Sequence, residues 1–411
     1  MRQTRCALSW LGGAALVMAL VGAGGPQAGA QATEKAADSA VLWTDTFDTN
    51  AGGWITLGPS GKASVTTEAA QARMGKGALA FAYHVGEKAG AEPKGDNPGN
   101  LPIDILLRPT PNGELAKMRS LRFWVRADDD VPLVLALSEK GGGRYITLFW
   151  LPKDSWQQVT LTPGDFWLSD DKNDPKDPDD KLDLDQVENI GLVSIWAFLA
   201  LGAGDTPESV AVFARHMGAH TLWLDEFTAS AAPPAEAPAP AEDAQAGKGF
   251  WIDDLRRDVL TWFPFGDAQL RLEKSGAPFK GRALRVDYQQ AEGKYVALIR
   301  DMRRFDLTKS DRLTFETASA KSAKIVLSLE EKGGAKYNAL LDIPGDSVPI
   351  RKSVSFADFT LAEDSPKDEN GHLDLDQLKT LTLVDITGAF GIGAQKNTLW
   401  IGPLRALTLN L

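Results

Sequence analysis

Short apolar runs and stretches of alternating apolar and polar residues recur along most of the chain, separated by glycine, proline and aspartate. Residues 121–126 alternate, residues 132–137 form a short apolar run, and residues 145–151 are apolar again after a glycine-rich turn. Alternation with a period of two is typical of half-buried β-strands, and such a turn between two runs is typical of a hairpin. Helical signals are limited to single turns at 184–189 and 375–380. The pattern therefore predicts an all-β sandwich or barrel.

The two halves of the chain carry the same landmarks in the same order. The matching pairs are Trp43 with Trp251, Asp45 with Asp253, Trp54 with Trp262, Phe123 with Phe315, Tyr145 with Tyr337, Asp165 with Asp358 and Trp223 with Trp400. Ordered landmarks of this kind predict two copies of one module. The spacing changes most at 197–220, where copy one carries an insertion.

A segment of proline, alanine and glutamate separates the two copies. Residues 231–242 contain no large apolar side chain, so this segment cannot bury itself and is expected to be a semi-extended linker. We therefore predict copy one at 40–230, a linker at 231–249 and copy two at 250–411.

The first thirty residues predict export. Arg2 and Arg5 precede an apolar run at 16–21, and the small residues 28–30 follow it. This order is typical of a secretory signal peptide, and the run is too short and too rich in glycine for a good membrane span. We therefore expect residues 1–30 to be cleaved, leaving a periplasmic or extracellular protein with no integral membrane segment.

Charge and cysteine content narrow the possible partners and chemistry. The chain has 44 basic and 55 acidic residues, a net charge of −11, which argues against nucleic acid and anionic membranes as partners. Its single cysteine, Cys6, lies in the expected signal peptide, so the mature chain can form no disulfide and no thiolate metal site.

Catalytic signatures are scarce. None of the four histidines has the spacing of a nucleophile–base pair or of a two-histidine zinc site; they are His84, His216, His220 and His372. The acidic stretch 170–180 lacks the register of a calcium-binding loop and is interpreted as a solvated loop. The sequence therefore predicts a binding protein and not an enzyme, although it does not exclude the paired carboxylates of a glycoside hydrolase.

Several segments together resemble the galactose-binding-like jelly roll, the fold of many non-catalytic carbohydrate-binding modules, including those of the family-eleven type. The segments are 45–48, 155–166, 182–186 and 222–227. The resemblance covers 40–230 well and 250–408 more loosely. It implies two tandem jelly-roll β-sandwich domains and a polysaccharide or glycan as partner, and it specifies the fold better than the ligand.

The same resemblance implies a structural calcium ion between the first and last strands of such a module. The matching positions are Asp45, Asp48 and Asp225, which would supply only part of a shell of six to eight oxygens. Copy two has Gly402 in place of Asp225, so calcium is expected in copy one only. Ordinary turn and edge carboxylates are the alternative.

Two tryptophans are candidates for stacking on sugar rings. Trp124 and Trp150 correspond to Glu316 and Asp342 in copy two, and a position that alternates between tryptophan and carboxylate is expected to face outward. We therefore expect Trp124 and Trp150 to form a platform, and glycan binding to belong to copy one. The expected hydrogen-bond donors beside it are Arg122, Arg126 and Arg144.

Three alternatives to this site and function remain open. Both tryptophans would be structural if they packed beneath the insertion at 197–220. The protein would then be a structural or adhesion module of the cell envelope without a small ligand. A glycoside hydrolase, or an accessory subunit of one, is the third class. The exposure of Trp124 and Trp150 discriminates between these alternatives.

Overall fold

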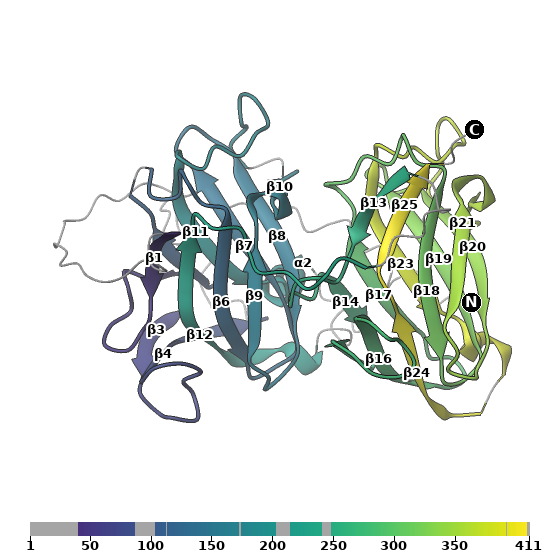
Figure 1. Cartoon of the computed structure of the whole chain (residues 1–411), viewed down its shortest axis with the longest axis horizontal. Helices are drawn as coiled ribbons and strands as arrows, with labels where there is room; N and C mark the ends of the chain where they lie inside the picture. Colours follow the sequence, from purple (N-terminus) through teal and green to yellow (C-terminus); the bar gives the residue numbers. More distant parts are fainter. Residues whose placement is uncertain are drawn as a thin grey trace. The chain divides into compact units, whose positions relative to one another are not determined.

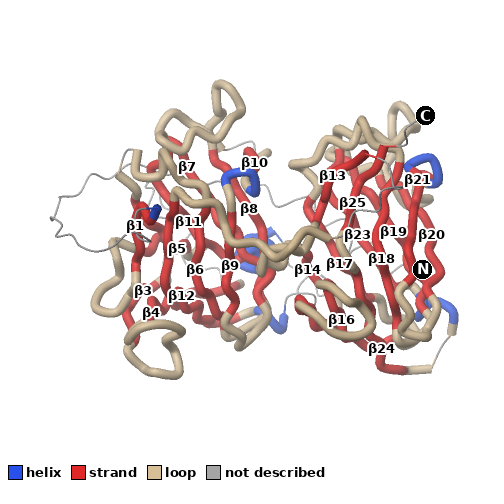
Figure 2. The backbone as a smooth tube through the Cα atoms, in the orientation of Figure 1, coloured by secondary structure: helices blue, strands red, loops and turns tan. Residues whose placement is uncertain are grey.

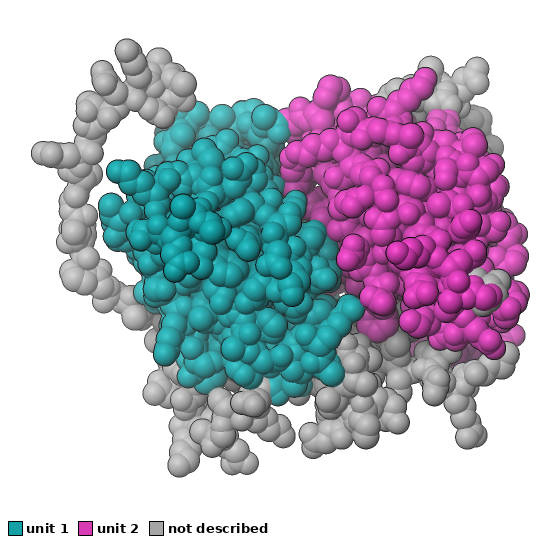
Figure 3. All heavy atoms as spheres, turned by 90° about the horizontal axis from the view of Figure 1, so that it is seen from below, with its two compact units in different colours: residues 1–235 teal, residues 236–411 magenta. Residues whose placement is uncertain are grey.

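The computed structural model describes residues 40–86, 103–111, 113–171, 174–202, 214–240, 248–391 and 393–408. They form two compact units, which divide between Ala235 and Glu236 and are coloured separately in Figure 3. The expected signal peptide at 1–30 lies outside the described residues. Among the helices of the described segments, none is long and apolar enough to cross a membrane.

Unit 1 consists of two antiparallel β-sheets (Figures 1 and 2). Its strands are β1 (Val41–Asp45), β2 (Ile55–Leu57), β3 (Lys62–Thr66), β4 (Ala78–Val85), β5 (Ile105–Pro109), β6 (Ser120–Ala127), β7 (Val131–Glu139), β8 (Arg144–Leu151), β9 (Gln157–Leu161), β10 (Trp167–Leu168), β11 (Val187–Ser194) and β12 (Gly218–Ser230). Its short helices are η3 (Pro163–Asp165), α2 (Ile195–Gly202) and η4 (Ala214–His216). One sheet has the order β3-β4-β12-β6-β9 with β1 beside β12, and the other has the order β10-β8-β7-β11-β5-β2.

Aromatic side chains fill the space between these two sheets. Phe123 of β6 packs edge-on against Phe149 of β8, with ring centroids 6.0 Å apart, and stacks on Phe227 of β12 at 4.7 Å. All three rings are at most 2% exposed. Because successive side chains of a strand point to opposite faces, Trp124 on β6 and Trp150 on β8 lie on the outer faces of their sheets.

Unit 2 repeats this architecture. Its strands are β13 (Lys248–Asp253), β14 (Trp262–Phe265), β15 (Ala268–Glu273), β16 (Ala283–Gln290), β17 (Val296–Asp301), β18 (Arg312–Ser319), β19 (Ala323–Glu331), β20 (Lys336–Ile343), β21 (Ile350–Ser355), β22 (Thr360–Leu361), β23 (Leu378–Asp385), β24 (Gln395–Ile401) and β25 (Leu404–Thr408). Its short helices are η5 (Phe356–Asp358) and η6 (Thr387–Phe390). One sheet has the order β13-β25-β18-β24-β16-β15 with β21 beside β18, and the other has the order β14-β17-β23-β19-β20-β22.

The predicted fold class is confirmed: the chain is all-β, with two tandem jelly-roll β-sandwiches. The single turns expected at 184–189 and 375–380 are present but shorter. Gln186 donates to the carbonyl of Asp183 at 2.9 Å and Gln377 to that of Asp374 at 3.0 Å, and β11 already begins at Val187 and β23 at Leu378. The sequence analysis missed α2 within the insertion. This helix is apolar on all sides, so it lacks the periodic polar face from which an amphipathic helix is predicted.

Candidate functional site

The expected tryptophan platform does not form. Trp124 and Trp150 belong to different sheets of unit 1, so their rings cannot share one surface. Trp150 is only 3% exposed, and its ring meets that of Trp196 from α2 edge-on, at 6.4 Å between centroids. The prediction that Trp150 faces a ligand is therefore wrong. Asp342, the counterpart of Trp150 in unit 2, is exposed. Only unit 1 has an insertion that covers this position, so the exposure of Asp342 did not predict that of Trp150.

Trp124 lies on the outer face of its sheet, half-buried, but its ring is not free. The guanidinium of Arg73 lies over the ring, 4.3 Å from its centroid. A cation over an aromatic face is an attractive contact that competes with a sugar for the same surface. Glu316, the counterpart of Trp124 in unit 2, is exposed, as the sequence predicted.

The three arginines expected beside the platform have different surroundings. Arg122 is exposed. Arg126 donates to the carbonyl of Ala70 at 3.1 Å and lies over the ring of Trp223, 5.2 Å from its centroid. Arg144 is only 5% exposed and forms an ion pair with Asp174, so the prediction that it contacts a ligand is wrong. The acidic stretch at 170–180, expected to be solvated, anchors Arg144 through this pair.

Asp45 is part of a buried hydrogen-bond cluster and does not fit a calcium ligand. Its Oδ2 accepts from Nε1 of Trp54 at 2.9 Å and from Nε of Arg108 at 2.8 Å. Unit 2 repeats the tryptophan–aspartate bond, at 2.9 Å, between Trp262 and Asp253. A contact that is present in both units is best explained as structural. Asp45 is therefore interpreted as a structural residue and not as a calcium ligand.

Asp48 and Asp225 both hold the loop that precedes β4. The Oδ2 of Asp225 accepts from the backbone N–H groups of Arg73 at 2.8 Å and Met74 at 2.7 Å, and Asp48 accepts from that of Lys76. Asp225 is fully buried, and its Oδ1 has no hydrogen-bond partner. Burial raises the pKa of Asp225, although the two N–H groups act in the opposite direction.

The unpartnered Oδ1 of Asp225 is suited to a cation, because a buried carboxylate oxygen without a donor gains from a positive charge. Asp48 holds the same loop and is the other carboxylate that could contribute. Among the described residues, however, no group of three or more His, Cys, Asp or Glu side chains comes together in the manner of a metal site. The expected set of three carboxylates is therefore reduced to Asp48 and Asp225, and calcium itself stays a prediction.

A histidine cluster holds the insertion of unit 1 in place. Nδ1 of His216 lies 2.6 Å from Oδ2 of Asp129, and its ring stacks on Trp196 at 4.3 Å. His220 lies beside it, with Nε2 3.0 Å from the carbonyl of His216, and a hydrogen bond with Asp128 raises the pKa of His220. No pattern in the sequence predicted that these two histidines would lie side by side. His216 is only 2% exposed, which favours a structural role over catalysis.

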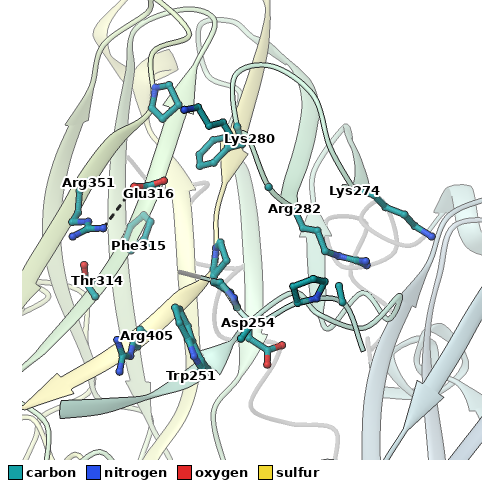
Figure 4. A pocket seen from close by; sticks show the side chains of 18 of the residues that line it. Trp251, Asp254, Lys274, Lys280, Arg282, Thr314, Phe315, Glu316, Arg351 and Arg405 are labelled. Atoms are coloured by element: carbon teal, nitrogen blue, oxygen red, sulfur yellow. Dashed lines mark ion pairs between the residues drawn. The ribbon is translucent and has the colours of Figure 1, made fainter. Parts of the chain in front are cut away.

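The structure places a groove of about 890 Å³ on unit 2, which the sequence analysis did not foresee (Figure 4). It is lined by Ala237, Pro238, Ala239, Pro240, Trp251, Asp254, Lys274, Pro278, Phe279, Lys280, Gly281, Arg282, Thr314, Phe315, Glu316, Pro349, Arg351, Pro403 and Arg405. A volume of this size is typical of sites for small ligands or short oligomers.

The floor of the groove is built from neighbouring strands. Trp251 of β13 is paired with Arg405 of β25, which in turn is paired with Thr314 of β18. Trp251 is half-buried, with the guanidinium of Arg405 5.0 Å from its ring centroid. Glu316 and Arg351 form an exposed ion pair at 3.8 Å from β18 and β21. An aromatic ring thus lies among several hydrogen-bonding groups.

One wall of the groove is the loop before β16. Phe279 is 7% exposed and belongs to an apolar cluster with Ala283, Ala318 and Trp400. Its ring lies against Gly402, where an added Cβ would be 3.1 Å from Cε1 of Phe279. Gly402, which stands where unit 1 has Asp225, therefore leaves space for the ring of Phe279 beneath the loop.

The other wall is the segment 237–240 of the predicted linker. The carbonyl of Ala237 accepts from Nε of Arg256 at 2.8 Å, and its N–H donates to the carbonyl of Arg256 at 3.1 Å. Glu236 forms an ion pair with the same arginine at 2.8 Å. Part of the predicted linker is thus fixed to unit 2, where its prolines face the groove.

Trp251 corresponds to Trp43 as a landmark of the repeat, and this correspondence predicted no binding role for it. The two rings differ in their surroundings, because Trp43 stacks on the buried Phe227 at 5.8 Å whereas Trp251 lines the groove. Trp251 therefore gives copy two an aromatic ring that the comparison of Glu316 and Asp342 with the tryptophans of copy one did not include. Three prolines in separate loops of copy two line the groove, at positions 278, 349 and 403. They are the feature of the sequence from which rigid loops around a groove could have been predicted.

Neither a family model nor a curated protein matches the chain. Among solved structures, it is similar to the family 11 carbohydrate-binding module of the cellulosomal cellulase Lic26A-Cel5E of Clostridium thermocellum, with 15% identity, 40% of this chain and 96% of that chain covered, and a TM-score of 0.33. It is also similar to the CBM22-1-CBM22-2 tandem domain from Paenibacillus barcinonensis Xyn10C, with 12% identity, 90% and 98% covered, and a TM-score of 0.28. The resemblance to carbohydrate-binding modules expected from the sequence is thus found among solved structures, and at these values it says nothing about the ligand.

Proposed function

We propose that the protein is an exported, non-catalytic carbohydrate-binding protein and that its polysaccharide ligand binds in the groove of unit 2. The half-buried ring of Trp251 at the floor of this groove is the observation that carries the proposal. The apolar face of a pyranose ring stacks on such an aromatic surface, and nearby polar side chains fix the hydroxyl groups. Thr314, Glu316 and Arg351 line the groove beside Trp251 and carry such polar groups.

The surroundings of the carboxylates support a non-catalytic role. Glu316 is paired with Arg351, and Asp254 accepts from the backbone N–H of Arg256 at 3.0 Å and lies 4.0 Å from its guanidinium. Hydrolysis of a glycosidic bond generally needs one carboxyl group as proton donor and a second as base or nucleophile. Each groove carboxylate instead lies within 4.0 Å of an arginine guanidinium. Export rests on the signal-peptide pattern of residues 1–30.

Isothermal titration calorimetry with a panel of soluble polysaccharides tests the proposal. Trp251→Ala is expected to weaken binding roughly ten- to a hundredfold, as for loss of one stacking aromatic. Trp124→Ala is a matched control, since Trp124 is also half-buried on the outer face of a sheet but is covered by Arg73. Thermal melting of both variants checks that the units remain folded.

Loss of binding in Trp124→Ala, with Trp251→Ala unaffected, would contradict the assignment to unit 2. If no polysaccharide binds, the proposed function itself is wrong, and a structural or adhesion module becomes the better interpretation.

A further inference from the structure

The groove of unit 2 is basic although the chain is acidic. Five cationic side chains and two carboxylates line it, whereas the whole chain has a net charge of −11. The cations come from separate elements: the loop before β16, β21 and β25. A local excess of positive charge on an acidic protein marks a place suited to an anionic ligand.

Not all of these cations are equally available. Lys274 and Arg282 share the carboxylate of Asp258, which neutralises part of their charge. Lys280 is exposed, and no ion pair joins it to another of the described residues. Arg351 is also exposed and forms an ion pair with Glu316 at 3.8 Å. Lys280 is therefore the cation that a ligand can reach at the lowest cost.

The close-up shows how these groups surround the groove (Figure 4). Lys280 lies on the loop wall at the top of this view and Trp251 on the floor below, with Glu316 and Arg351 between them. A saccharide whose ring stacks on Trp251 would thus place its charged substituents among cationic side chains. The contributions of ring stacking and of charge contacts to the affinity can be separated by varying the salt concentration. Salt screens the charge contacts and weakens them, whereas it has little effect on stacking.

We propose that the ligand of this groove is an anionic polysaccharide, whose carboxylate or sulfate groups contact Lys280 and Arg351 while one of its rings stacks on Trp251. This inference rests on the proposed function and adds the substrate class. The net charge of −11 disfavours nonspecific binding of such a polymer to the rest of the surface.

Matched pairs of polymers test the inference on the full chain by calorimetry at two salt concentrations. Polygalacturonate is compared with its methyl ester, and dextran sulfate with dextran, so that charge changes while the backbone is kept. We expect at least tenfold tighter binding of one charged member, which also identifies the carboxylate or the sulfate as the recognised group, and weakening with salt.

Two lysine variants sharpen the test. Lys280→Ala is expected to weaken binding of the charged polymer roughly three- to tenfold and to leave the binding of a neutral polymer unchanged. Lys396→Ala removes an exposed lysine of β24 that does not line the groove. This variant is expected to bind the charged and the neutral polymer as tightly as the wild-type protein does.

Equal affinity for the charged and neutral members of both pairs, with Trp251→Ala still weakening binding, would overturn the anionic specificity and leave the proposed function intact. Binding of a charged polymer that Trp251→Ala and Lys280→Ala leave unchanged would overturn the inference as well, since the polymer would then bind elsewhere. Absence of binding to every polymer, charged or neutral, would overturn the proposed function together with this inference.

Discussion

Unit 1 and unit 2 close the same corner of their sheets in opposite ways. In unit 1, Asp225 binds the backbone of the loop before β4, and Arg73 of that loop lies over Trp124. In unit 2, Gly402 takes the place of the aspartate, Phe279 packs against it, and the following residue, Lys280, is exposed at a groove. In unit 1, therefore, a buried carboxylate holds the loop and the ring of Trp124 is covered. In unit 2, an aromatic ring packs beneath the loop and the neighbouring surface forms an open groove.

This comparison shows how a duplicated module can keep its fold while its surfaces diverge. The repeated contacts, such as the bond from Trp54 to Asp45 and its counterpart in unit 2, lie in the interior. The surface residues that differ lie in loops and on outer faces, where a change of side chain does not disturb the packing of the sheets. A repeat in sequence is thus a guide to the core and not to the binding site.

The largest expected effect comes from Trp150→Ala in unit 1. Because Trp150 is only 3% exposed and packs against Trp196, its truncation leaves a cavity and should lower the free energy of unfolding by about 3–5 kcal/mol. Differential scanning calorimetry of the full chain measures it, and Asp342→Ala at the exposed counterpart in unit 2 is the control. An unchanged melting temperature together with lost glycan binding would show that Trp150 contacts the ligand and is not a structural residue.

Asp225→Ala is expected to have the next largest effect. Removing the acceptor leaves two backbone N–H groups without a partner and should cost about 2–3 kcal/mol. If calcium binds at Asp48 and Asp225, a chelator such as EGTA lowers the melting temperature of the wild-type protein and has no effect on this variant. A calcium-dependent rise in melting temperature that persists in Asp225→Ala would show that the metal assignment is wrong.

A smaller effect concerns an acidic cluster that both units share. Burial raises the pKa of Glu139 to about 7, the carboxylates of Asp177, Asp179 and Asp183 act in the same direction, and the N–H of Asp183 opposes them. Between its ordinary pKa of 4.5 and about 7, the folded protein binds more protons than the unfolded chain, so stability falls as pH rises through this window.

Glu139→Gln is therefore expected to raise the melting temperature at pH 8 and to leave it nearly unchanged at pH 4.5. Burial also raises the pKa of Glu331, the counterpart in unit 2, and Glu331→Gln should show the same sign with a smaller gain. Thermal melts of the two variants across pH measure both. A gain at pH 4.5 that disappears at pH 8 would contradict the assignment.

The sequence predicted the fold because strand alternation and repeated aromatics report burial in a sandwich directly. It failed at the site for two physical reasons. The exposure of Trp150 depends on α2, a helix that is apolar on all sides and gives no periodic signal. The groove depends on Gly402 and Phe279, which lie far apart in the sequence and meet only when β24 and the loop before β16 come together. Such long-range contacts are not readable from local patterns.

Hydrogen–deuterium exchange of the full chain, with and without the best-bound polysaccharide, locates the binding surface. We expect the ligand to protect the backbone amides of residues 279–282 and 350–351 at the groove of unit 2 and to leave those of β6 and β8 in unit 1 unchanged. Protection of β6 and β8, with no change at the groove, would contradict this expectation.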